Sequence, residues 1–163
     1  MDGMGTGTPT PRRGAVRDWL AKAHPVPRQA MAEWANHGVA LLPLGARFDA
    51  VRVPASRIHA AVGSDEPSVV AGTLGEWLHG PVIRDTRTGQ GTYYVLVALD
   101  AEWAGAEDRL GAGTYLAVPC VGEQVSPVTY WVVRPFRRGG LCDTAHLAAL
   151  LAVAGTVERE AGR

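Results

Sequence analysis

The part of the sequence with the clearest capacity for chemistry is a polar turn at residues 84–91, RDTRTGQG. Its arginines offer guanidinium groups, its threonines offer hydroxyls, and its glycines let backbone N–H groups approach a ligand, as in turns that hold phosphate. The candidate ligand-binding residues in this turn are Arg84, Arg87, Thr88 and Gly91. A short turn that contains glycine is also a common β-hairpin connection, so a purely structural role stays open.

The turn leads directly into seven consecutive apolar or aromatic residues, Tyr93 to Leu99. This run is short for a helix, is rich in aromatic and β-branched side chains, and lacks the alternation of a half-exposed strand. We therefore expect a central strand with both faces covered, paired across the turn with a short strand at Val82–Ile83.

A second basic segment contains Arg134, Arg137 and Arg138 around Phe136. An arginine beside an aromatic ring can hold phosphate and stack on a base, although the same residues suit an ordinary solvated loop. We add Arg134 to the candidate ligand-binding residues.

Nucleophilic and metal chemistry have less support in the sequence. Cys142 and His146 are four residues apart, which on a helix places them on one face, but a helical cysteine among alanines and leucines is more often buried packing. The five histidines show no HxH, HxxxH or HExxH spacing, and the two cysteines show no CxxC spacing. We therefore predict no metal site.

The composition limits the classes of partner. A chain of 163 residues suits one domain, which we place at residues 14–163 after a disordered lead-in at residues 1–13. Sixteen basic residues balance sixteen acidic ones, so any contact with nucleic acid must use a local patch. The N-terminal segment has no apolar core and the cysteines form no disulfide pattern, so we expect a cytoplasmic protein without membrane contact.

The remaining pattern predicts an α+β fold. Helices are expected over residues 14–23, 27–37, 56–62, 69–78 and 142–160. Strands are expected over residues 39–44, 48–53, 82–83, 93–99, 114–119 and 128–133, with the last two paired to each other and an irregular segment over residues 100–113. Hairpins interleaved with helices indicate a single domain with a mixed, mainly antiparallel sheet and helices packed on it.

Three segments, in chain order, resemble the N-terminal domain of bifunctional DNA primase/polymerases, the prim-pol branch of the archaeo-eukaryotic primase superfamily. AMAEWANHGVALLPL is similar to the family's helix and following strand, which ends in Pro-Leu. RDTRTGQGTYYVLV is similar to its second motif, a Thr-x-Ser-Gly-Gly turn that enters an apolar strand carrying a histidine. GAGTYLAVPC is similar to a later glycine-rich strand that ends at a proline. The resemblance covers roughly residues 30–135, also fits short actinobacterial proteins of this type, and implies a primase/polymerase-like core.

The departures from the family fall on its catalytic positions. The first motif is an Asp-x-Asp that holds metal, whereas this chain reads FDAVRVP, with Asp49 present and Arg52 near the second position. The phosphate-binding histidine of the second motif is replaced by Thr92 or Tyr93, and the third-motif aspartate matches only Asp108, loosely. Because cations stabilise the charge of phosphoryl transfer, the resemblance implies the scaffold and argues against polymerase activity.

We therefore expect a non-catalytic, prim-pol-like domain with a degenerate active site. It would act by binding a nucleotide, nucleic acid or a partner protein, in a regulatory role. Asp49 and Arg52 join the candidate residues. Arg52, Arg84 and Arg87 would contact phosphate, while the Thr88 hydroxyl and the Gly91 amide would donate hydrogen bonds.

Two alternatives stay open. One is an enzyme with a reduced active site, which would use Asp49 and Asp108 with Mg²⁺ or Mn²⁺, or Cys142 as a nucleophile. The other is a protein interaction module with an empty cleft, which would contact its partner through tryptophans such as Trp77 or Trp103. No cofactor is expected outside the enzyme alternative, and the oligomeric state is left open.

Overall fold

The predicted central strand is the middle strand of a five-stranded antiparallel sheet. The structure, a computed structural model, describes residues 11–122, 126–137 and 139–162, except for the side chains of residues 11–13 and 161. The strands lie in the order β5 (Asp108–Leu110), β2 (Asp49–Pro54), β4 (Thr92–Val97), β3 (Val82–Asp85), β7 (Thr129–Val133). The hairpin of β3 and β4 confirms the expected pairing across the polar turn.

A smaller sheet pairs β1 (Val39–Pro43) with β6 (Tyr115–Pro119). The prediction that residues 114–119 pair with residues 128–133 is therefore wrong, because β6 pairs with β1, and β7 pairs with β3. The register explains the choice: Ala40 lies opposite Val118, and Leu42 opposite Leu116, so the buried side chains of both strands fall on one face.

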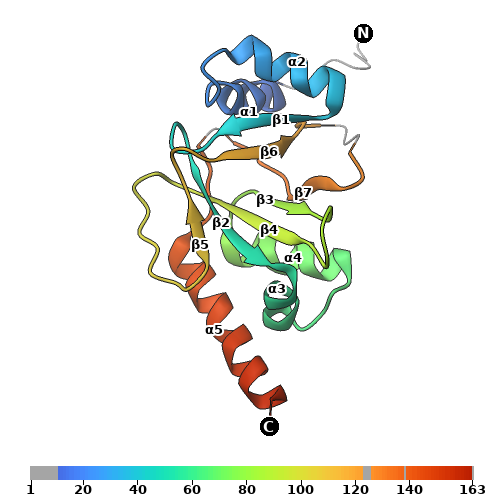
Figure 1. Cartoon of the computed structure of the whole chain (residues 1–163), viewed down its shortest axis with the longest axis vertical. Coiled ribbons are helices and arrows are strands. Elements are labelled where there is room, and N and C mark those ends of the chain that lie inside the picture. Colours follow the sequence, from blue (N-terminus) through green and yellow to red (C-terminus); the bar gives the residue numbers. More distant parts are fainter. Residues whose placement is uncertain (1–10, 123–125, 138, 163) are drawn as a thin grey trace.

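The helices cover two different regions of these sheets (Figure 1). Helices α1 (Pro11–Ala21) and α2 (Pro27–His37) lie against the small sheet, at the blue end of the molecule. The opposite face of the five-stranded sheet, which does not pack on the small sheet, is covered by three helices: α3 (Ala55–Val62), α4 (Pro67–Leu78) and α5 (Thr144–Ala161). Glycines in the left-handed conformation end α2 and α3, at Gly38 and Gly63, with φ of 76° and 83°.

The five-stranded sheet separates two hydrophobic cores. We call its first face the one that contributes Ala50 and Leu96 to a core with α1, α2 and the small sheet. We call its second face the one that contributes Val51 and Val95 to a core with α3, α4 and α5. Successive side chains of a strand point to opposite faces, so both faces of β4 are covered, as its unbroken apolar run predicted.

Several boundaries differ from the sequence-based expectation, and one strand was not expected. The first helix begins at Pro11, inside the expected disordered lead-in, while residues 1–10 lie outside the described residues. The last helix begins at Thr144, so Cys142 precedes it, and the Asp143 side chain accepts hydrogen bonds from two amides of its first turn. Strand β5 lies within residues 100–113, where no strand was expected. The helices in the described part of the chain are all too short or too polar to span a membrane.

Candidate functional site

Two of the predicted residues, Arg52 and Arg87, line one cleft between the two sheets. Arg52 lies on the first face of β2, opposite Tyr94 on β4, and Arg87 follows the end of β3. The cleft has a volume of about 180 Å³. We call it the inter-sheet cleft, and its lining residues are Leu41, Arg52, Asp85, Arg87, Tyr94, Leu110, Thr114, Tyr115, Leu116 and Ala117.

Arg87 is held in place by Asp85, the last residue of β3. Its Nε lies 3.0 and 2.9 Å from the two carboxylate oxygens, a terminal nitrogen lies 2.6 Å from Oδ2, and its backbone N–H donates to Oδ1 at 2.9 Å. Burial opposes ionisation of Asp85, but these hydrogen bonds outweigh it and keep the pKa of Asp85 below its usual value. The Arg87 side chain remains 60% exposed, so an oriented guanidinium faces solvent at the cleft.

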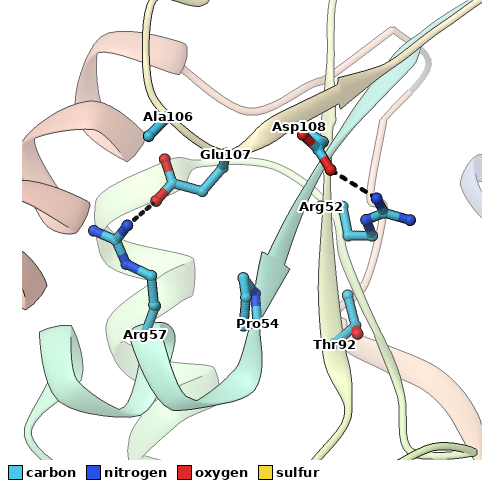
Figure 2. Close-up of a pocket in the computed structure, with 7 residues that line it drawn as sticks. All are labelled: Arg52, Pro54, Arg57, Thr92, Ala106, Glu107 and Asp108. Atoms are coloured by element: carbon cyan, nitrogen blue, oxygen red, sulfur yellow. Dashed lines mark hydrogen bonds and ion pairs between the residues drawn. The ribbon is translucent and has the colours of Figure 1, made fainter.

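A second cavity, of about 390 Å³, lies beside the inter-sheet cleft at the β5 edge of the sheet. Figure 2 shows its two ion pairs: Arg52 with Asp108, at 2.7 Å, and Arg57 of α3 with Glu107, at 2.5 Å. Arg52 lines both cavities, so the two meet at its side chain. The Arg52–Asp108 pair is solvent-exposed, whereas Glu107 is almost completely buried.

Asp49 lies on the second face of β2, away from the inter-sheet cleft. It accepts a hydrogen bond at 3.0 Å from Nε of Arg109, whose terminal nitrogens donate to the carbonyls of Ala98, Leu99 and Ala101. The Asp49 side chain is only 12% exposed. This pair therefore joins β2 and β5 to the turn after β4, which is a structural role.

Asp49 and Asp108, the carboxylates of the metal-dependent alternative, point to opposite faces of the sheet. Asp108 lies opposite Arg52 in the β2–β5 register, and Arg109 lies opposite Val51. Among the residues that the structure describes, no group of three His, Cys, Asp or Glu side chains could hold a metal ion. The geometry thus gives these two carboxylates no common metal site.

Arg84 is separated from the inter-sheet cleft by the sheet itself. It lies on the second face of β3, with its guanidinium 5.1 Å from the centre of the Tyr93 ring, and it donates to the Gln90 carbonyl at 3.2 Å. It lines a third cavity, between β3 and α4. The three predicted phosphate contacts are therefore split between the two faces of the sheet.

The other candidate residues of the polar turn have mainly structural surroundings. Gly91 has a φ of 91°, and a Cβ atom there would lie 2.7 Å from the Asp85 carbonyl oxygen. Its N–H donates to the Thr88 carbonyl at 2.9 Å, so the expected amide donor is already used within the turn. Thr88 is exposed and lines none of the three cavities.

Arg134 also lies apart from the cavities. It is exposed beyond the end of β7 and lines none of the three. In the same segment, the Arg137 guanidinium lies 5.8 Å from the centre of the Phe136 ring, and Arg138 lies outside the described residues.

Cys142 is placed where a nucleophile would not work. Its side chain is buried, its thiol donates to the Pro81 carbonyl at 3.3 Å, and burial raises the pKa of the thiol far above its usual range. His146 does not activate it, because its Nδ1 donates to the Trp77 carbonyl at 2.9 Å. The expected shared helical face is wrong, since Cys142 precedes α5.

The tryptophans of the interaction alternative differ in exposure. Trp77 on α4 is 41% exposed. Trp103 is half-buried and donates from Nε1 to the Glu107 carbonyl at 2.8 Å.

Sequence reasoning missed Tyr94, Arg57 and Arg109. Tyr94 could have been found from the alternation of β4, which places it beside Arg52 once the pairing is known. Arg57 and Arg109 join segments 50 or more residues apart, through contacts to Glu107 and Asp49. No local pattern in the sequence signals such contacts.

Comparisons of this chain with protein-family models, with curated proteins and with solved structures found no match.

Proposed function

We propose that this chain is a non-catalytic binding domain that takes a phosphate-bearing ligand, a nucleotide or a short single-stranded nucleic acid, in the inter-sheet cleft. The observation that carries the proposal is that Arg52 and Arg87, from different parts of the chain, line one cleft together with Tyr94. Guanidinium groups bind phosphate through several oriented N–H donors.

Both arginines keep donors for a ligand although each has a carboxylate partner. Arg87 uses Nε and one terminal nitrogen on Asp85. Arg52 uses one terminal nitrogen on Asp108. Since a guanidinium has five N–H donors, each arginine retains some for a phosphate.

Aromatic rings at the cleft suit the base of a nucleotide. Tyr94, which lines the cleft, is half-buried, and Tyr115 on β6 is 63% exposed. Bases stack on such rings with little dependence on sequence, and each stacked base contributes about 1–3 kcal/mol. The resemblance to the prim-pol family is a second, independent reason to expect a nucleotide here.

The carboxylates near the cleft favour binding over phosphoryl transfer. Asp85 and Asp108 are each engaged by an arginine, and Asp49 lies on the other face. Catalysis of phosphoryl transfer requires cations that neutralise the developing charge, held by converging carboxylates. A binding domain without turnover would act in regulation.

Thermal unfolding in the presence of ligands tests the proposal. The probes are ADP, ATP and short oligonucleotides of DNA and RNA, each with and without Mg²⁺. A ligand at about 100 times its dissociation constant adds roughly 2.7 kcal/mol to the free energy of unfolding. Arg52→Gln should remove most of this gain, because it deletes a cleft arginine and leaves only the exposed Asp108 unpaired.

The matched control is Arg47→Gln, which removes an exposed arginine in the turn between β1 and β2. It changes the net charge equally but lines none of the three cavities described above, so ligand stabilisation should persist. Equal losses in the two variants would show a non-specific charge effect and contradict the proposed site. An absence of stabilisation by every probe would contradict the proposed ligand class.

A further inference from the structure

The third cavity lies on the second face of the sheet, between the start of α4 and strands β3, β4 and β7. It has a volume of about 270 Å³. We call it the α4 pocket, and its lining residues are Pro67, Ser68, Val70, Ala71, Arg84, Tyr93, Tyr130, Trp131 and Val132. It shares none of its lining residues with the inter-sheet cleft, so the two can bind ligands separately.

Arg84 gives this pocket a positive charge without a matching carboxylate. Of the four arginines that line the cavities, Arg52, Arg57 and Arg87 each form an ion pair, while Arg84 has none within the described residues. Its Nε is buried and has no hydrogen-bond partner there. A buried donor without an acceptor is costly, so an anion that accepts from it gains affinity.

The groups around Arg84 form no ion pair with it within the described residues, although the Asp65 carboxylate acts electrostatically on His59 and Tyr93. The Tyr93 hydroxyl lies 2.8 Å from His59 Nε2, and burial together with the Arg84 charge lowers the pKa of His59, so this histidine is neutral at pH 7. The Glu66 carboxylate, before α4, is engaged by the Ser68 hydroxyl and the Val69 N–H. The pocket therefore combines one cation without an ion pair and a neutral Tyr–His pair, while the Asp65 and Glu66 carboxylates stand directly before its first lining residue, Pro67.

Apart from Ser68, the rest of the lining is apolar or aromatic. Val70 and Ala71 come from α4, and Val132 comes from β7. The tyrosines Tyr93 and Tyr130 add aromatic surface beside the guanidinium. At about 30 Å³ for each water-sized group, the volume suits a ligand of roughly nine non-hydrogen atoms.

We propose that the α4 pocket binds a small aromatic monocarboxylate, whose carboxylate accepts hydrogen bonds from Arg84 while its ring lies against the apolar and tyrosine side chains. The pairing of one cation with an apolar cavity selects one negative charge on an apolar body. This site is independent of the proposed phosphate site, because Arg84 and Arg87 lie on different faces of the sheet.

Amide chemical shifts of the ¹⁵N-labelled full chain, titrated with phenylacetate, test this proposal. Phenethylamine, which has a similar shape and the opposite charge, is the matched control ligand. We expect saturable shifts at residues 68–71 and 130–132 with phenylacetate, at least tenfold weaker binding of the amine, and no shifts around the inter-sheet cleft. Equal binding of both compounds, or no shifts at millimolar phenylacetate, would overturn the proposal.

Two variants distinguish a loss of ligand binding at the α4 pocket from a loss of folding. Arg84→Gln should weaken the binding of phenylacetate at least tenfold and leave ligand binding in the inter-sheet cleft unchanged. Ala71→Leu keeps the charge but fills the pocket, so it should also abolish binding. If both variants bind like the natural chain, the site lies elsewhere and the proposal fails. Shifts at residues 68–71 and 130–132 with a peptide ending in phenylalanine, but not with phenylacetate, would assign the pocket to peptide C-termini and also overturn the proposal.

Discussion

Arg84 and Asp85 are neighbours on β3, yet their side chains line cavities on opposite faces of the five-stranded sheet. Arg84 lies over the Tyr93 ring on the α4 side, while Asp85 holds Arg87 at the inter-sheet cleft. One hairpin therefore serves two cavities of different character. The proposed phosphate site and the proposed carboxylate site both follow from this alternation.

The turn between β3 and β4 should tolerate no side chain at Gly91. Gly91→Ala would combine a φ of 91° with a Cβ atom 2.7 Å from the Asp85 carbonyl oxygen. We expect a loss of about 2 kcal/mol in the free energy of unfolding, measured by urea titration. Gly72→Ala on α4, where a Cβ meets nothing within 4 Å, is the control and should stabilise by roughly 0.5–1 kcal/mol. Equal effects of the two changes would argue against the turn geometry.

Asp49 should matter for stability and not for ligand binding. Asp49→Asn weakens a largely buried ion pair with Arg109, whose other donors hold the turn after β4. Since breaking one side of a buried pair costs about 3 kcal/mol, urea denaturation should show a large loss. Asp108→Asn, at an exposed pair, should cost less than about 1 kcal/mol. A folded Asp49→Asn variant that loses nucleotide binding would show that Asp49 belongs to the ligand-binding site.

Cys142 should resist alkylation in the folded chain. The thiol is buried and burial raises its pKa, so little thiolate forms and a reagent cannot reach it. Mass spectrometry after iodoacetamide treatment at pH 8 should find Cys142 unmodified until urea unfolds the protein. The more exposed Cys120 should react first. Rapid labelling of Cys142 under native conditions would support the alternative in which Cys142 is a nucleophile.

Asp85 should stabilise the fold in a pH-dependent way. Its pKa is lowered from the usual 3.8 in the folded state, so the unfolded chain binds its proton more readily. The stabilisation is thus present above about pH 4 and is lost as the pH falls through the lower, folded-state value. Asp85→Asn should lower stability at pH 7 and reduce the acid sensitivity between pH 4 and pH 2, as followed by urea midpoints. If the loss of stability between pH 4 and pH 2 is the same in Asp85→Asn as in the natural chain, other carboxylates cause it.

Local patterns predicted much of the fold. The apolar run at residues 93–99 identified the central strand, and the helices expected over residues 27–37 and 56–62 end where α2 and α3 end. The pairing of the strands was harder to predict than their positions, because β6 and β7 have similar apolar patterns. Pairing was decided by which register brought Leu42 and Leu116 together in the core.

The candidate site was predicted only in part. Arg52 and Arg87 do line one cleft, whereas Asp49 and Arg84 lie on the other face. Strand alternation alone separates Asp49 from Arg52, since three residues along a strand reverse the direction of the side chain. The Arg109 contact with Asp49 spans 60 residues, and only the folded register brings the two together.

The most direct test of the phosphate site is the salt dependence of binding to a labelled single-stranded hexanucleotide, compared between the natural chain and Arg52→Gln. Two phosphate contacts, from Arg52 and Arg87, predict a slope of log K against log salt of about −1.4, and Arg52→Gln should reduce it by about 0.7. Arg47→Gln should leave the slope unchanged. An unchanged slope in Arg52→Gln, or the absence of binding at low salt, would contradict the proposed function of the inter-sheet cleft.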